Sequence, residues 1–194
     1  MLNRNLRKFT CSSIILLMLL ICPPVKAQGT TSPIWAVAWC PQSNILAFGH
    51  EDGNVEIIDA LTQSQIATTD VSTYSISSIS CSPDGSLLAV STYSGRINVL
   101  DIDTGDIVKE LDDGDDVIYS VDWNPDGSML ASANQNDSRD SYSVKVWDVA
   151  TGQVIVTLTE DARIITEIDW SPDCTWYPSS GCMERRVRAL CPMD

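Results

Sequence analysis

The chain has 194 residues, with 12 Lys and Arg against 26 Asp and Glu, which gives a formal net charge of −14. Such an acidic surface repels phosphate backbones, and no basic patch interrupts it, so we expect no nucleic-acid partner. The chain carries one histidine, no metal-ligand spacing and no Gly-rich phosphate loop. We therefore expect no catalytic residue, no metal site and no cofactor.

Residues 1–27 are predicted to be a secretory signal peptide. Three basic residues precede a 14-residue apolar run from Phe9 to Cys22, and Val-Lys-Ala27 then provides small residues at the cleavage positions. The run is short for a membrane span, so a retained anchor and lipidation at Cys22 are the weaker alternatives. We expect a secreted or periplasmic protein, cleaved near Ala27 and without a stable membrane anchor.

A segment that recurs four times begins after this region. Its anchoring prolines, spaced by 42, 42 and 47 residues, are Pro41, Pro83, Pro125 and Pro172. A repeat of roughly 40–45 residues with an apolar strand, a turn and two further strands is typical of a propeller blade. The prediction for residues 28–172 is therefore an all-β fold, a β-propeller built from four-stranded antiparallel sheets.

The first strand of each repeat carries an apolar pair two residues apart, which places both side chains on one face. The second member of this pair is Trp39, Cys81, Trp123 or Trp170. We expect the three tryptophans to be structural residues and Cys81 to pack in the core. An odd number of cysteines, five, remains after cleavage and none lies in a Cys-x-x-Cys motif, so neither a zinc site nor a complete disulfide framework is indicated.

The remaining strands follow in a fixed order. The second strand ends near Ala47, Ala89 or Ala131, where neighbouring sheets should approach closely, and the third alternates apolar residues up to Asp59, Asp101 or Asp148. The Asp148 turn, which continues to Thr151 and Gly152, leads into a fourth strand. The fourth strands are predicted at roughly 64–69, 106–111 and 153–159.

Four motifs of the third repeat carry a family resemblance. They are Asn124-Pro-Asp-Gly127, Leu130-Ala-Ser132, Val144-Lys-Val-Trp-Asp148 and Thr151-Gly152. With them, residues 32–172 resemble the WD-repeat β-propeller family, and we expect a divergent bacterial member. The resemblance implies a non-enzymatic scaffold that binds protein or peptide partners.

The family's blades contain a buried tetrad of Trp, Ser or Thr, His and Asp. Trp147 and Ser132 match its first two positions in the third repeat, and Asp52 matches the turn Asp in the first. The Gly-His dipeptide before the first strand is missing. His50, the only histidine, lies between the second and third strands of the first repeat.

The fourth repeat departs from the pattern, so residues 173–194 are assigned to a degenerate repeat or C-terminal tail. Cys174 stands where Gly is expected, and Pro178 falls inside the second strand. Either the tail caps the last blade or the chain is a fragment of a longer propeller. With about 3.5–4 blades the ring is expected to stay open, and its unpaired edges would favour self-association.

Loops on a rigid scaffold commonly carry binding, and two sets of loops should line one face of this propeller. One set precedes the first strands and the other joins the second and third strands, where the third repeat has an insertion at 134–141. The candidate partner-binding residues are His50, Tyr74, Tyr93, Asp116, Asn136, Asp137, Arg139 and Arg163.

Two acidic features are open to other interpretations. The cluster from Asp112 to Asp116 could hold Ca²⁺, but a solvated loop is the favoured interpretation. Asp122 and Asp169 occupy equivalent places and could face the channel, where a solvated wall is favoured over acid chemistry. The alternatives to a binding module are a secreted propeller hydrolase or lyase, a sugar-binding propeller, and a non-functional fragment.

Overall fold

The computed structural model describes residues 32–41, 43–112, 114, 116–136, 141–161, 165–171 and 187–188. All regular elements within these residues are β-strands. Accordingly, the described residues include no helix that could cross a membrane. The predicted signal peptide and most of the 173–194 tail lie outside the described residues.

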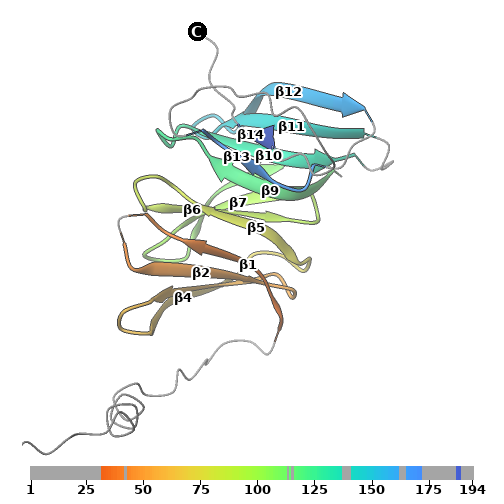
Figure 1. Cartoon of the computed structure of the whole chain (residues 1–194). Coiled ribbons are helices and arrows are strands. Elements are labelled where there is room, and N and C mark those ends of the chain that lie inside the picture. The colour runs from red at the N-terminus through yellow and green to blue at the C-terminus, as the bar shows by residue number, and fades with distance from the viewer. Residues whose placement is uncertain are drawn as a thin grey trace, which may run out of the picture.

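Three four-stranded antiparallel sheets form the body of the molecule (Figure 1). The first contains β1 (Ile34–Trp39), β2 (Ile45–His50), β3 (Asn54–Asp59) and β4 (Ser64–Asp70). The second contains β5 (Ile76–Cys81), β6 (Leu87–Thr92), β7 (Arg96–Asp101) and β8 (Ile107–Asp112). The third contains β9 (Val117–Trp123), β10 (Met129–Gln135), β11 (Ser141–Asp148) and β12 (Gln153–Asp161). Strands pair in sequence order in each sheet, which is the arrangement predicted for a propeller blade.

The fourth repeat forms a different element. β13 (Ile168–Asp169) pairs in parallel with β14 (Val187–Arg188), whereas every pairing within the three complete sheets is antiparallel. β13 nevertheless follows the repeat, because it packs beside β9 as β9 packs beside β5.

Turn chemistry explains the strand boundaries. In the Pro-Asp-Gly turns, Gly85 and Gly127 adopt φ angles of 74° and 75°, a region that favours glycine. Their amides donate to Ser82 O and Asn124 O, which closes each turn between the first and second strands. Asp148 Oδ1 accepts hydrogen bonds from both the amide and the hydroxyl of Thr151, and these bonds hold the turn into β12.

The core lies between neighbouring sheets. The predicted alanines of the second strands, Ala47, Ala89 and Ala131, are buried there. Gly49 marks the closest approach, because a Cβ at this position would lie 2.4 Å from Cγ2 of Ile76 on the next sheet. Small residues on the second strand thus allow one sheet to stack on the next.

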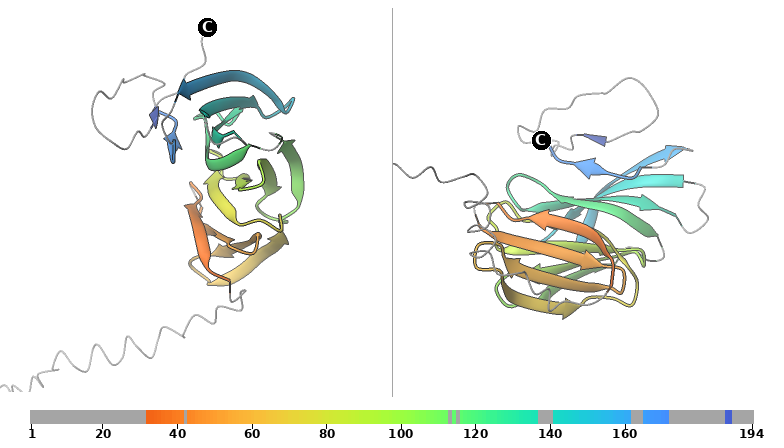
Figure 2. Two further views of the ribbon diagram at one scale, coloured as in Figure 1. Left: turned by 90° about the vertical axis from the view of Figure 1, so that its right-hand side faces the viewer. Right: turned by 60° about the horizontal axis from the view of Figure 1, so that its bottom comes forward.

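The sheets follow an arc around a common axis, and the arc does not close (Figure 2). The innermost strands β1, β5, β9 and β13 line its concave side, with β1 at one end and β13 at the other. The expectation of an incomplete ring of about three to four blades is therefore confirmed.

Trp39 does not occupy the buried position expected for it. Its side chain is 55% exposed, whereas Trp123 is 4% exposed. The two residues occupy the same position in their repeats, but within the described residues no sheet covers the face of β1 that carries Trp39. The prediction that Trp39 is a structural residue like Trp123 is therefore not met within the described residues, because burial at this position depends on a preceding blade.

Candidate interaction face

The loops at one end of the sheets pack against each other in pairs. The loop after β2 contacts the segment that leads into the second sheet, since Val71 N donates to Gly53 O over 3.0 Å. The loop after β6 contacts the segment that leads into the third sheet, where a Cβ on Gly95 would lie 2.5 Å from Asp116 O. These paired loops form one surface, which we call the loop face.

Three aromatic residues lie in line along the inner rim of the loop face. The rings of Trp35 and Tyr93 meet edge to face with centroids 6.5 Å apart, and those of Tyr93 and Tyr119 meet in the same way at 5.9 Å. We call these residues the aromatic row. Each comes from a different sheet, so the row spans the three complete blades.

Polar contacts continue the aromatic row into the third sheet. The hydroxyl of Tyr119 donates to Gln135 Oε1 over 2.6 Å, and Gln135 Nε2 donates to the hydroxyl of Tyr142 over 2.8 Å. Gln135 and Tyr142 are buried. Tyr119 is therefore held in place by a satisfied buried network, while Trp35 at the other end is half exposed.

The concave side of the arc forms a hollow of about 410 Å³ next to the aromatic row. Its wall combines serines of β5 with Tyr119 and three acidic residues, Asp122, Glu167 and Asp169. Lys and Arg are missing from the described residues that line it. The hollow is therefore polar and negatively charged.

Asp122 does not behave as the solvated wall residue that we favoured. Its Oδ1 accepts a hydrogen bond from Ser80 Oγ at 2.9 Å, and its Oδ2 accepts one from the backbone amide of Trp170 at 2.8 Å. Burial raises the pKa of this carboxyl above its ordinary value, although these hydrogen bonds act in the opposite direction. One carboxylate thereby links three consecutive repeats.

A second link between repeats comes from the tryptophans of the innermost strands. Trp123 Nε1 donates to Ser80 O, and Trp170 Nε1 donates to Asp122 O, each over 3.1 Å. In both cases the indole reaches the backbone of the preceding repeat. We call this contact the indole link.

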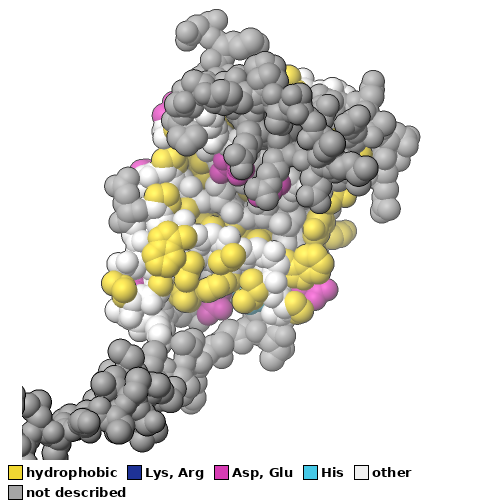
Figure 3. All heavy atoms as spheres, viewed as in Figure 1, with side chains coloured by type: hydrophobic (Ala, Val, Ile, Leu, Met, Phe, Trp, Pro, Cys, Tyr) yellow, Lys and Arg dark blue, Asp and Glu magenta, His cyan; other side chains and the backbone are white. Residues whose placement is uncertain are grey.

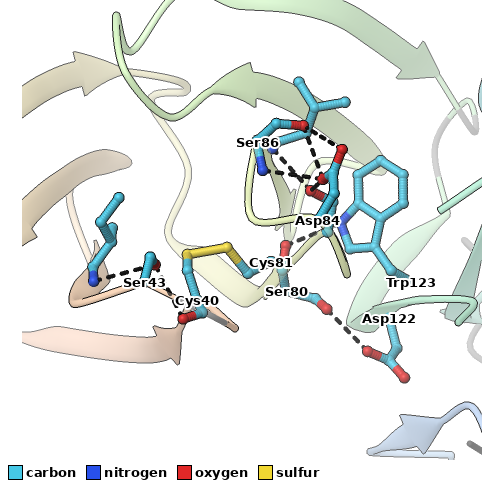
Figure 4. Close-up of a disulfide and its surroundings, with 11 residues drawn as sticks. Cys40, Ser43, Ser80, Cys81, Asp84, Ser86, Asp122 and Trp123 are labelled. Carbon is cyan, nitrogen blue, oxygen red and sulfur yellow. Dashed lines mark hydrogen bonds between the residues drawn. A yellow bond between two sulfur atoms is a disulfide. The ribbon is translucent and has the colours of Figure 1, made fainter. Parts of the chain in front are cut away.

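Cys81 occupies the indole-link position of the second repeat, and it makes a covalent link instead. It forms a disulfide with Cys40 of the first repeat, with a Cα–Cα distance of 5.2 Å (Figure 4). The assignment of Cys81 to simple core packing was therefore incomplete. A usable signal was present, since the two cysteines are 41 residues apart, close to one repeat length.

The candidate partner-binding residues differ in their surroundings. Tyr74 is 58% exposed on the loop face, and Tyr93 is part of the aromatic row. Asp116 forms a 2.9 Å ion pair with Lys145 and is half buried. β10 extends to Gln135, so the loop predicted at 134–141 is shorter than expected. Asn136 follows this strand, and its backbone amide donates to Ser141 O.

His50 is corrected from a surface position to a buried one. Its side chain is 3% exposed, and its Nδ1 lies 3.1 Å from Ser32 O. The residue supports the loop face from beneath. The other candidates, Asp137, Arg139 and Arg163, lie outside the described residues.

The Trp and Ser positions of the family tetrad are connected in the third sheet. Trp147 Nε1 donates to Ser132 Oγ at 2.9 Å, and Ser132 Oγ donates to Asn134 Oδ1 at 2.6 Å. All three side chains are buried. Asn134 thus continues a network for which sequence reasoning had identified only two members.

Sequence reasoning also missed Trp35 and Tyr119 as members of one site. Both directly follow the isoleucine that recurs near the start of the innermost strands, Ile34 or Ile118, and the equivalent residues of the other two repeats are Ser77 and Thr166. Aromatic residues at two of these four positions were a visible signal. Their meeting with Tyr93, from a loop of another repeat, could be recognised only in three dimensions.

The acidic loop after β8 shows ordinary loop contacts where it is described. Asp112 Oδ1 accepts a hydrogen bond from Gly114 N, and Asp116 pairs with Lys145. The described part of the chain contains no group of three or more residues suited to hold a metal ion. Residues 113 and 115 lie outside the described residues.

Two family descriptions match the sequence. The WD40 domain of anaphase-promoting complex subunit 4 matches residues 19–81 and 37–123, and the WD domain, G-beta repeat, matches 105–148. The first description alone extends over more than half of the chain. The chain belongs to the WD40-repeat family.

The similarity to solved structures supports the same fold. A chain in a crystal structure of the mitotic checkpoint complex superposes with a TM-score of 0.65 and 22% sequence identity. The match covers 75% of this WD40-repeat chain and 43% of the other, so our chain spans less than half of that relative. No curated protein matches the sequence.

Proposed function

We propose that this WD40-repeat chain is an exported, non-enzymatic module that binds a protein or peptide partner through its loop face. Propellers of this family typically serve as scaffolds for protein interactions. The observation that carries the proposal is the aromatic row of Trp35, Tyr93 and Tyr119. It provides the partly exposed aromatic surface on which such an interaction can be centred.

Aromatic side chains suit this role because they offer a large contact area with few rotatable bonds. Tyr and Trp are enriched at interface positions that dominate binding energy. The edge-to-face packing of the row restricts the rings before a partner arrives. Less side-chain entropy is then lost on binding.

The charge around the row indicates the character of the partner. Asp122, Glu167 and Asp169 line the adjacent hollow, and the whole chain carries a formal net charge of −14. Opposite charge speeds encounter and favours the correct partner. A segment with Lys or Arg would also gain from cation–π contact with the aromatic rings. We therefore infer a basic peptide segment as the ligand.

Two observations support export. Residues 1–27 have the charge, apolar run and small residues of a signal peptide. The Cys40–Cys81 disulfide suits an oxidising compartment, since such bonds are rare in reducing ones. Export would place the loop face outside the cell or in the periplasm.

Selection from a displayed library of peptides, half of them enriched in Lys and Arg, tests the binding proposal. We expect basic peptides to be selected. The substitutions Trp35→Ala and Tyr93→Ala should each weaken their binding by about tenfold or more, because central aromatic contacts contribute about 2 kcal/mol. Leu61→Ala is the control, since Leu61 is 74% exposed in the turn at the opposite end of the first sheet.

Thermal melts show whether each variant remains folded. The proposal fails if the selected peptides bind the folded Trp35→Ala and Tyr93→Ala variants as tightly as the wild type. It also fails if Leu61→Ala weakens binding equally, because the contact would then not be localised to the loop face.

A further inference from the structure

The exposed face of β1 is an apolar feature of the described residues that the proposed function does not explain. Ile34, Val37 and Trp39 are all more than half exposed and lie on the first strand of the arc. Figure 3 shows hydrophobic side chains gathered on this side of the molecule. In the equivalent positions, Ile118, Val121 and Trp123 are buried against the preceding sheet.

The repeat defines what should cover this face. Trp123 and Trp170 donate their indole N–H to the backbone oxygen of Ser80 and Asp122, which occupy one position in consecutive repeats. The next residue in this series is Asp169, on β13 at the far end of the arc. An indole link from Trp39 would therefore require an innermost strand such as β13 to lie beside β1 and provide the accepting backbone oxygen.

Asp169 occupies the acceptor position of the indole link at the other end of the arc. Its equivalent, Asp122, is largely buried and accepts the backbone amide of the next tryptophan, Trp170. Asp169 itself is exposed on the wall of the hollow. A following repeat that begins with a strand like β1 would complete its surroundings in the same way.

The two halves cannot meet within one chain, because the arc leaves β1 and β13 apart (Figure 2). We propose that a second copy of the chain completes the ring, with β13 of each copy covering β1 of the other. Each copy contributes four innermost strands, β1, β5, β9 and β13, so two copies provide eight blade positions. Propellers typically contain about 4–8 blades.

The superposition with a solved structure is compatible with this arrangement. The matching 75% of the chain covers 43% of the longer chain, so further blade positions of that chain have no counterpart here. Two copies related by a two-fold axis would bury the β1 face twice, and such symmetric association is the commonest form of oligomer. Ring closure and the proposed peptide binding depend on different aromatic residues of β1, Trp39 and Trp35, so variants of these two residues separate the two proposals.

The Cys40–Cys81 disulfide supplies a template for the test. Cys40 ends the first strand of one repeat and Cys81 occupies the indole-link position of the next. At the proposed junction, the equivalent residues are Ser171 of one copy and Trp39 of the other. We would make Trp39→Cys in one full-length chain and Ser171→Cys in another, with the cysteines outside the disulfide changed to serine.

Mild oxidation of the mixed chains should give a covalent heterodimer. Trp39→Cys alone and Ser171→Cys alone should remain uncrosslinked. The matched control replaces the first variant with Trp35→Cys, which carries its change on the same strand but on the side that faces Tyr93. A covalent dimer of Trp39→Cys alone would overturn the proposal, because two β1 faces would then be packed together.

Sedimentation of the unmodified protein gives a second measurement that depends on no engineered bond. We expect a dimer at micromolar concentration. Trp39→Ala should raise the dissociation constant of this dimer by about tenfold or more. The association should strengthen with salt, since both copies carry a large net negative charge. A monomer up to about 100 μM would overturn the proposal and leave the β1 face to a different blade.

Discussion

At the scale of single residues, Asp122 illustrates how a channel-facing carboxylate can serve the fold. Its two oxygens accept hydrogen bonds from the second and fourth repeats while its own strand belongs to the third. Both donors stabilise the charged form, yet burial raises the pKa overall. The residue is therefore protonated more readily in the folded protein than in the unfolded chain.

This shift has a defined consequence for stability. The native state binds the Asp122 proton more tightly, so the free energy of unfolding should fall as the pH rises from the ordinary Asp value towards the raised native pKa. Asp122→Asn removes this dependence. Relative to the wild type, the variant should gain stability across that interval, measured by urea unfolding between about pH 3 and 7.

Asp148→Asn is the control of opposite sign. The backbone and hydroxyl hydrogen bonds of Thr151 lower the pKa of Asp148, so its contribution to stability is lost as the pH falls. This variant should lose stability relative to the wild type as the pH rises. If both variants shift in the same direction, burial does not dominate at Asp122.

At the scale of elements, the four innermost strands share a plan but link to their neighbours differently. β9 ends in Trp123 and β13 is followed by Trp170, and each indole N–H donates to the preceding repeat. β5 instead ends in a cysteine bonded to Cys40. β1 ends in Trp39, whose indole is exposed. The same position therefore carries two kinds of link to the preceding repeat, an indole hydrogen bond or a disulfide. At β1, which has no preceding sheet among the described residues, the tryptophan is exposed.

The contribution of the Cys40–Cys81 disulfide to stability can be tested by removing it and by replacing it with an indole link. Cys40→Ser with Cys81→Ser should lower the free energy of unfolding by about 2–4 kcal/mol, since the bond closes a loop of 41 residues. Cys40→Ser with Cys81→Trp should recover part of this loss, because an indole could donate to Ala38 O. Urea unfolding under oxidising conditions measures both.

The outcome for the two variants separates the alternatives. If the double serine variant unfolds at the same urea concentration as the wild type, the disulfide does not stabilise the folded state. If the tryptophan variant is no more stable than the serine variant, the equivalence between the two kinds of link is wrong.

The strands and their order were predictable from the sequence because each is encoded locally. Apolar periodicity and Pro-Asp-Gly turns located the strands, and the fourth strand predicted at 153–159 was observed at Gln153–Asp161. The exposure of Trp39 and the burial of His50 were not predictable in this way. Both depend on which segment lies opposite, and a repeat pattern describes a unit without describing its neighbours.

At the scale of the whole molecule, the proposed export accounts for both the predicted signal peptide and the disulfide. A chain that enters an oxidising compartment can form and keep the Cys40–Cys81 bond. Cleavage after Ala27 would leave a short segment before Ser32, the first residue of the described structure. The loop face, to which Ser32 contributes, would then lie near the new N-terminus.

The cleavage site is tested by N-terminal sequencing of the exported protein, which should begin at Gln28. Ala27→Arg should block or displace cleavage, because signal processing requires a small residue at this position. Mature protein that retains Met1 would show that the segment is not removed. Unchanged cleavage of Ala27→Arg would place the processing site elsewhere.

The indole link has a consequence for how such a chain can grow. Each tryptophan donates to a main-chain oxygen, so Ser80 and Asp122 serve as acceptors although their side chains differ. The tryptophan of a duplicated or exchanged repeat could therefore donate to the backbone oxygen of any preceding repeat with the same backbone conformation. Gene duplication could thus lengthen the array without matched mutations at each new junction, and the disulfide junction, which needs cysteines on both sides, would be the exception.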